Sequence, residues 1–369
     1  MARVNLTHAV EILDSLNDGL YVTDTERRIV YWNKSAERIT GWTTADVVGH
    51  PCMDNILNHV DKDGRRLCYT DFCPLYRCMV TDSESTCPVI IFAQTKTGKR
   101  VPVAVSVAPL HDADGEVIGG VETFQDYSEN YANLEQAKRI QILSLEHDLP
   151  KDSRVSFSSF YLPHDMIGGD YFAIRQLDSD HYGFFLADVM GHGIAAALHT
   201  MHLSSLWSRY SNALMHPSRF AQVLNRYLCK IVKDESYATA ICGVLDVFKM
   251  KVRIASAGGP PLVLVRSNGH TKQVSASGLP FGMIADAEYE ESEFSCESGD
   301  SLLMFTDGAI EIHNAAGGML GTEGLLGILN SLGYPKSYIR IEPLEEALLN
   351  YSKGIRLDDD LTLLEIRFS

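Results

Sequence analysis

The sequence lacks any apolar run long enough to cross a bilayer, and it lacks an excess of basic residues. No stretch reaches the ~18 consecutive apolar residues that a membrane helix needs. Lys and Arg total 32 against 48 Asp and Glu, which gives a formal net charge of −16. Nucleic acids and anionic membranes bind basic surfaces. We therefore expect no nucleic-acid partner and no membrane partner.

A signal peptide and the usual Cys-x2-Cys metal frameworks are also missing. Residues 1–16 have no uninterrupted apolar core and are typical of an amphipathic helix, so we expect a cytoplasmic protein. In that compartment the eight cysteines are expected to be thiols or metal ligands rather than disulfides. The length of 369 residues, with 45% hydrophobic and 22% charged residues, allows two soluble domains that each bury a core.

Residues 1–126 follow a recognisable order of elements. Two β-prone runs lie in residues 19–32, and a short helix is expected at residues 33–41, with Asn33 as its cap and Gly41 as its end. Turn signals separate three later β-prone runs, Val89–Thr95, Val101–Pro109 and Glu116–Phe124. This order, the D-G-L-x3-D-x3-R-I-x3-N pattern at 18–33 and the Phe-Gln-Asp at 124–126 resemble a PAS domain. The resemblance implies a sensor with an antiparallel sheet and small helices.

Five cysteines of this domain lie close together in the sequence: Cys52, Cys68, Cys73, Cys78 and Cys87. The stretch resembles PAS domains with a G-R-x-L-C…C-P-L pattern. Cys52, Cys68, Cys73 and Cys78 are candidate ligands of zinc or an iron–sulfur cluster, because soft thiolates suit both. Alternatively they are half-buried small hydrophobes with one redox-active pair. His50 and His59 are expected to be solvated.

Residues 127–150 are predicted to form a helical connector, because they are rich in helix formers and contain no Gly or Pro before Pro150. An apolar stripe recurs at spacings of three and four: Tyr127, Tyr131, Leu134, Ala137 and Ile140. This stripe either packs on the chain's own domains or forms a coiled-coil seam between two chains. The position between two domains favours the seam, so we expect a homodimer through residues 127–149.

Residues 151–369 carry aspartates at the ends of predicted strands. Asp170 follows a Gly pair, Asp188 ends the apolar run Tyr182–Val189, and Asp307 follows Ser301–Phe305. Three aspartates, Asp358, Asp359 and Asp360, precede a final strand. Hard divalent ions take carboxylate ligands, and two such ions activate water and offset phosphoryl charge. Alternatively, strand-end aspartates only cap turns.

Helices at Ile194–Tyr210 and Ser218–Val232, with several hairpins, predict an α+β sandwich. The motifs at 168–172 (GGDYF), 187–193 (ADVMGHG), 305–308 (FTDG) and 359–362 (DDLT) resemble the PPM (type 2C) serine/threonine phosphatases, in particular their SpoIIE-like bacterial branch. The resemblance covers roughly residues 140–369 and implies an α/β/β/α sandwich at 151–369 that binds two Mn²⁺ or Mg²⁺ ions. A water activated by these ions would hydrolyse phosphoserine or phosphothreonine.

The resemblance also implies roles for individual residues. The implied metal ligands are Asp170, Asp188, the carbonyl of Val189, Asp307 and Asp359, with Asp358 or Asp360 as alternatives to Asp359. Asp170, Asp188 and Asp307 are the implied catalytic residues, and His192 is a candidate proton donor to the leaving oxygen. Arg154 and Arg175 are candidate phosphate contacts by their location alone.

Three hypotheses follow for the whole chain. In the first, PAS input controls a protein phosphatase through the connector and the helix after Gly193, and the resemblance suggests a phosphorylated anti-sigma-factor antagonist as the substrate. In the second, the chain is a non-catalytic redox or metal sensor whose phosphatase-like half binds a phosphorylated partner. In the third, the N-terminal half is a dimerisation module without a ligand.

Overall fold

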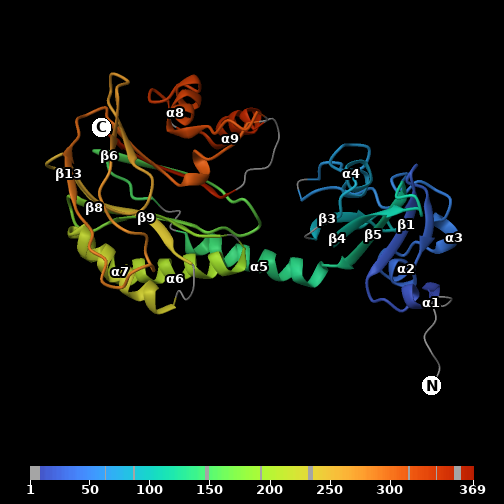
Figure 1. Ribbon diagram of the computed structural model, residues 1–369. Coiled ribbons are helices and arrows are strands. Elements are labelled where there is room, and N and C mark those ends of the chain that lie inside the picture. The colour runs from blue at the N-terminus through green and yellow to red at the C-terminus, as the bar shows by residue number, and fades with distance from the viewer. Residues whose placement is uncertain are drawn as a thin grey trace. The chain divides into compact units, whose positions relative to one another are not determined.

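The computed structural model of this chain consists of two compact units, Met1–Leu134 and Glu135–Ser369 (Figure 1). It describes residues 9–62, 64–85, 88–145, 149–191, 193–231, 236–314, 316–337, 339–352 and 359–369. Each unit has its own buried apolar core. No helix in these ranges combines the length and the apolar character needed to cross a membrane. The expected domain boundaries at residues 126 and 150 stay predictions.

The first unit is one antiparallel sheet with short helices, as predicted. Its strand order is β2-β1-β5-β4-β3. The strands are β1 (Gly19–Asp24), β2 (Ile29–Trp32), β3 (Val89–Gln94), β4 (Arg100–His111) and β5 (Val117–Asp126). The short helices are α1 (Ala9–Asp14), α2 (Lys34–Thr40), α3 (Thr44–Val47) and α4 (Pro74–Thr81).

Helix α2 begins and ends where the sequence predicted. The Asn33 side chain accepts hydrogen bonds from the Ala36 and Leu20 amides, at 2.8 and 2.9 Å. Gly41 ends the helix with a φ of 75°, a left-handed conformation that favours glycine. Asn33 therefore caps α2 and joins it to β1.

The connector forms helix α5 (Ser128–Ser144), which begins in the first unit and ends in the second. Near its start, the Tyr131 ring packs edge-on against Phe92 of β3, with 5.2 Å between ring centroids. Near its end, the stripe residue Ile140 is not buried against the chain's own units, and the expected seam between two chains stays a prediction. Ile140 is 45% exposed, whereas the next residue, Gln141, is 3% exposed. Helical periodicity could not reveal this, because Gln141 is buried by polar contacts with distant segments.

The second unit contains two five-stranded antiparallel sheets, ordered β13-β10-β9-β8-β7 and β12-β11-β14-β15-β6. Strands of the first sheet are β7 (Asp170–Gln176), β8 (His181–Val189), β9 (Ala238–Asp246), β10 (Lys251–Ala257) and β13 (Ser292–Ser295). Strands of the second are β6 (Val155–Leu162), β11 (Leu262–Val265), β12 (Thr271–Val274), β14 (Ser301–Phe305) and β15 (Leu361–Phe368).

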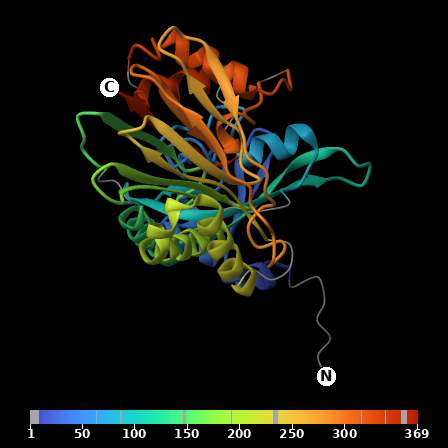
Figure 2. The same cartoon turned by 90° about the vertical axis from the view of Figure 1, so that its left-hand side faces the viewer.

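The sheets form the middle layers of the predicted α/β/β/α sandwich. Along β14, Leu302 and Met304 join the core between the sheets, whereas Leu303 and Phe305 join the core under α8 and α9. This alternation explains why β14 is apolar at successive positions. Figures 1 and 2 show α6 (Ile194–Tyr210) and α7 (Pro217–Ile231) on one side of the sheets. Helices α8 (Gly321–Ser331) and α9 (Ile341–Tyr351), which the sequence analysis did not assign, cover the other side.

Candidate metal centre

Strand pairing brings aspartates from both sheets to one end of the sandwich. In the first sheet, Asp170 of β7 lies directly opposite Asp188 of β8. In the second sheet, Asp307 follows β14 and Asp359 precedes β15, and these two strands pair through Phe305 and Leu363. Because the two sheets pack face to face, residues more than a hundred positions apart lie together here.

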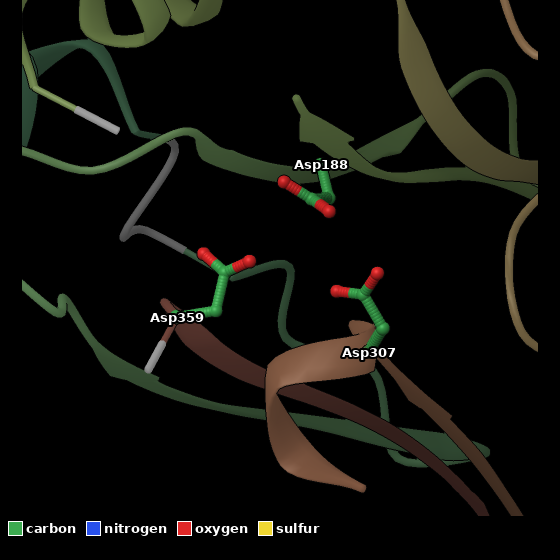
Figure 3. Close-up of side chains that lie close together, drawn as sticks. All are labelled: Asp188, Asp307 and Asp359. Carbon is green, nitrogen blue, oxygen red and sulfur yellow. The ribbon is translucent and has the colours of Figure 1, made fainter. Parts of the chain in front are cut away.

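Three carboxylates converge at this place. One oxygen each from Asp188, Asp307 and Asp359 lies within 4.8 Å of the other two, and the side chains face one another (Figure 3). Across the described parts of the chain, this is the one group of three or more His, Cys, Asp or Glu residues that meets so closely. All three residues belong to the ligand set implied by the sequence.

The carboxylates of this group repel one another when they are charged. Burial, followed by repulsion from Asp307 and Asp359, raises the pKa of Asp188 to about 8. Burial is also the main cause that raises the pKa of Asp359, and Asp307 adds to it. A divalent cation would offset this repulsion and reverse the shifts. Since all the converging donors are carboxylate oxygens, the group fits Mg²⁺ or Mn²⁺ better than a soft metal.

Asp170 lies beside the three carboxylates but has different partners. Its Oδ2 accepts hydrogen bonds from the hydroxyls of Thr306 and Thr362, at 2.8 and 2.5 Å. Its Oδ1 is buried without a hydrogen-bond partner. Burial and then the Asp188 and Asp360 charges raise its pKa well above the usual range. The two threonines orient the carboxylate, and the unpaired oxygen fits a role as a ligand of an ion.

Asp360 supports the loop before Asp170 rather than joining the converging group. Its Oδ1 accepts the His164 amide at 2.6 Å, and its Oδ2 accepts the Gly169 amide. Both oxygens are therefore bonded to the backbone, which favours Asp359 over Asp360 as a metal ligand. The alternative ligand Asp358 and the candidate proton donor His192 lie outside the described residues.

Gly169 lets the two aspartate strands approach closely. Its carbonyl accepts the Val189 amide at 3.0 Å. A Cβ at Gly169 would lie 2.7 Å from the Val189 carbonyl oxygen and 3.1 Å from that of Gly191. Glycine is thus required here for steric reasons, and it places the Val189 carbonyl, an implied ligand, beside the loop that carries Asp170.

Gln141 is a buried polar contact of this loop that the sequence analysis missed. Its side-chain nitrogen donates to the Gly168 carbonyl at 2.6 Å and to the Thr200 hydroxyl of α6 at 2.9 Å. Its side-chain oxygen accepts the Gly168 amide at 3.1 Å. Gln141 therefore joins α5, α6 and the loop before Asp170. The one signal in the sequence was a polar residue inside the short apolar run of residues 140–143.

Arg154 and Arg175, the candidate phosphate contacts by location, lie away from the aspartates. The Arg154 guanidinium pairs with Asp152 and Asp180, each at 2.7 Å. Arg175 donates to the Ser211 hydroxyl at 3.0 Å and lies over the Trp207 ring. The two arginines occupy the ends of β6 and β7 that are opposite to the aspartates. Proximity in sequence to the Gly-Gly-Asp motif did not translate into proximity in space.

The four candidate cysteines of the first unit are core residues. Cys52, Cys68, Cys73 and Cys78 are free thiols with at most 5% exposure, so the expected half-burial is wrong. Burial raises the pKa of each thiol, to about 11 for Cys78. Within the described chain they do not form a close group of three ligand atoms. Cys87 lies outside the described residues, and a cofactor bound by these thiols stays a prediction.

The two histidines near these cysteines in the sequence, His50 and His59, differ in solvent exposure. His50 is exposed, as expected, but His59 is only 3% exposed, so its expected solvation is wrong. The backbone amide of His59 donates to the Cys68 sulfur at 3.2 Å. The segment that carries His59 folds inward over the sheet, which a local reading of a polar loop could not show.

Comparisons with known proteins agree with this architecture. Residues 178–369 match the family model described as Stage II sporulation protein E (SpoIIE), and residues 13–132 match a PAS fold model. The chain is 32% identical over 182 residues to phosphoserine phosphatase RsbP of Bacillus subtilis. The matched residues cover 48% of this chain and 45% of RsbP. It is 24% identical over 237 residues to phosphoserine phosphatase RsbU of the same organism, covering 64% and 70%.

Two solved structures share the fold. The SiaA-PP2C domain of Pseudomonas aeruginosa matches with a TM-score of 0.55 at 19% identity, covering 65% of this chain and 97% of that domain. A Bacillus subtilis SpoIIE structure, containing the PP2C phosphatase domain and a fragment of the regulatory domain, matches with a TM-score of 0.51 at 18% identity. That match covers 72% of this chain and 71% of the SpoIIE structure. The predicted sandwich is confirmed.

Proposed function

We propose that this chain, which belongs to the SpoIIE family, is a metal-dependent protein phosphatase that acts on phosphoserine or phosphothreonine and is controlled by its PAS unit. The observation that carries the proposal is the convergence of Asp188, Asp307 and Asp359 from two sheets. Turn capping does not explain this convergence, because an aspartate that only caps a turn has no reason to lie against aspartates of another sheet. Membership of the family favours hydrolysis over simple binding.

The chain's own residues supply a rigid set of oxygen ligands. Asp188, Asp307 and Asp359 would hold the ions, and Asp170 and the Val189 carbonyl would complete the set. When bound, Mg²⁺ or Mn²⁺ would lower the pKa of a water molecule and offset the charge of the phosphoryl group. Thr306 and Thr362 hold Asp170 in one orientation through its Oδ2. Fixed ligand geometry of this kind lowers the reorganisation needed during the reaction.

Control by the PAS unit would pass through α5. Gln141 is bonded to both the amide and the carbonyl of Gly168, two residues before Asp170. The same side chain contacts Thr200 of α6, the helix that follows Gly193. A rotation or shift of α5 would therefore act directly on the loop that positions Asp170 and on α6.

The substrate and the assembly are further parts of this proposal. RsbP and RsbU are named phosphoserine phosphatases, and we propose a phosphorylated anti-sigma-factor antagonist as the substrate of this chain. A homodimer through residues 127–149 is supported by exposed apolar side chains on α5, namely Ile140, Ile142 and Leu143. The choice between Mn²⁺ and Mg²⁺ and the cytoplasmic location stay predictions.

The first test compares the wild type with Asp307→Asn on a phosphoserine protein in the presence of Mn²⁺. Removing one charged ligand should lower turnover by more than about 100-fold and weaken Mn²⁺ binding measured by calorimetry. Asp286→Asn, which changes an exposed aspartate of the same unit, serves as the matched control and should keep both properties.

Two outcomes would contradict the proposal. Equal turnover by the wild type and Asp307→Asn would show that the aspartate group is not the catalytic centre. A folded wild-type chain that binds a phosphorylated partner but has no turnover with either metal would favour the non-catalytic hypothesis.

A further inference from the structure

Glu122 is a buried acid in the centre of the first unit. It lies on β5, directly opposite Tyr21 of β1 and Val107 of β4. The residue has 0% exposure, and neither of its buried carboxylate oxygens makes a hydrogen bond of normal geometry, although the Tyr21 hydroxyl lies close enough to interact with the acid. An unpaired polar group in an apolar core is destabilising. Neither the fold nor the proposed metal centre requires an acid at this position.

A second buried titratable group lies beside it. The His59 Nε2 is 3.7 Å from the Glu122 Oε1, and His59 is also excluded from solvent. The other titratable groups that interact with Glu122 are phenol and thiol groups. They are Tyr21 of β1, Cys78 of α4, and Cys52, Cys68 and Cys73, which lie between α3 and α4 in the sequence. The cations nearby are Arg100, which acts on His59, and Arg27, which acts on Cys68 and Cys73.

Burial favours the neutral form of both members of the pair. Burial raises the pKa of Glu122 to about 8, and the Tyr21 hydroxyl opposes this shift. Burial, followed by the Arg100 charge, lowers the pKa of His59 to about 3. Because the pKa of Glu122 in the fold lies above its ordinary value, stability of this unit falls as the pH rises toward about 8. Ionised Glu122 is a buried charge, and its interaction with the Tyr21 hydroxyl offsets only part of the cost of burial.

We propose that Glu122 and His59 form a proton-responsive switch in the core of the PAS unit, and that it controls α5. When Glu122 releases its proton to solvent, its carboxylate either draws in the N–H of the neutral His59 ring as a hydrogen-bond donor or is hydrated by an opening of the segment that carries Cys52, His59 and Cys68. Both alternatives move side chains that pack against Glu122 on β5. This inference rests on the proposed function only for its effect on phosphatase activity.

The route from Glu122 to α5 is short. Strand β5 ends at Asp126, and α5 begins at Ser128. The Tyr127 amide at this junction donates to the Pro102 carbonyl of β4 at 3.0 Å, and Tyr131 packs on Phe92 of β3. A change in the sheet around Glu122 therefore reaches the anchoring contacts of α5 directly.

The test uses the full-length chain and two readouts that do not depend on catalysis. Infrared spectroscopy follows the band of a buried protonated carboxyl group, and hydrogen–deuterium exchange, corrected for intrinsic rates, follows the amides of β5 and α5. From about pH 6 to about pH 9, the wild type should lose the carboxyl band with a midpoint near 8 and should lose protection in both elements.

Glu122→Gln should abolish both changes, because the amide cannot ionise. Glu116→Gln, at an exposed position beside the same strand, should keep them. Glu122→Met, which replaces the acid with an apolar side chain of similar length, provides a second non-ionisable variant if the glutamine variant does not fold. A carboxyl group already ionised at about pH 6, or a band that titrates without any change in protection, would overturn the switch.

Phosphatase activity then tests the link to the second unit. The ratio of wild-type to Glu122→Gln turnover should change several-fold between the same two pH values, and a constant ratio would overturn control of the enzyme by the switch. A complete lack of turnover in both proteins would contradict the proposed function instead, and the infrared and exchange results would still decide whether the switch exists.

Discussion

Neighbouring residues of identical chemistry have different tasks at the candidate metal centre. Asp359 faces Asp188 and Asp307, whereas both oxygens of Asp360 accept backbone amides. Their order along a chain entering β15 explains the difference, because successive side chains of an extended segment point in opposite directions. Asp359 is therefore our proposed metal ligand, whereas Asp360 holds the loop before Asp170.

Gln141 provides a test of positioning at the residue scale. Gln141→Ala removes three hydrogen bonds to Gly168 and Thr200 and leaves buried polar groups unpaired, which should cost ~1–3 kcal/mol of stability. Because the loop before Asp170 loses its connection to α5, Mn²⁺-dependent turnover should fall roughly 10-fold. Steady-state kinetics and chemical denaturation of the purified variant measure the two effects.

Gln136→Ala is the matched control, since Gln136 is an exposed glutamine of the same helix. It should retain wild-type stability and turnover. If Gln141→Ala lost stability but kept full turnover and an unchanged Mn²⁺ requirement, Gln141 would support the fold without positioning the metal ligands.

At the scale of elements, α5 has two different faces near its end. One face buries Gln141, and the rest exposes apolar side chains, with Leu143 at 84% and Ile140 at 45% exposure. Exposed apolar groups in a row on a helix are typical of a protein interface. We therefore propose that this helix contacts the loop before Asp170 and a second chain at the same time.

The predicted homodimer can be tested by placing charge on the exposed face. The double substitution Ile140→Glu and Leu143→Glu should give a monomer in light scattering, because burying two carboxylates in an apolar seam is strongly unfavourable. Asn133→Glu, at an exposed polar position of α5, should remain a dimer. A dimer that persists in the double variant would place the subunit interface elsewhere.

At the scale of the whole molecule, the chain's division into units places the proposed catalytic residues and the proposed PAS input in separate units. The boundary between the compact units falls inside α5, after Leu134, so Gln141 belongs to the same unit as the aspartates. The contacts of α5 in this unit also include the Ser204 hydroxyl, which donates to the Ser144 carbonyl at 3.0 Å. The end of α5 is thus part of the second unit rather than a free linker.

Two fragments distinguish this boundary from the one at residue 150. Residues 135–369 should keep metal-dependent turnover and lose any response to the PAS unit. Residues 151–369, which lack Gln141, should turn over roughly 10-fold more slowly. Turnover of both fragments and the full-length chain, compared at equal Mn²⁺ concentration, provides the measurement. Equal activity of the two fragments would contradict a role for the end of α5.

Local sequence patterns were sufficient for much of the fold and part of the site. Alternating or continuous apolar runs predicted the central strands, and Asn33 and Gly41 marked the ends of α2, because these signals depend on residues a few positions apart. Ordered motifs around Asp170, Asp188, Asp307 and Asp359 indicated a metal centre through family resemblance. These aspartates could be recognised because each lies at the end of a predicted strand, which is a property of the local sequence.

The remaining features depended on contacts between distant residues, which only the tertiary structure decides. The bonds of Gln141 to Gly168 and Thr200 have no signature in the helix that carries it. The same is true of His59, which folded inward to Glu122 instead of facing solvent. The sequence by itself predicted many of the helices and strands, although not α8 or α9, and it marked the acids that are candidate metal ligands. Packing decided which polar side chains became buried, because burial depends on what covers a residue and not on its neighbours in the chain.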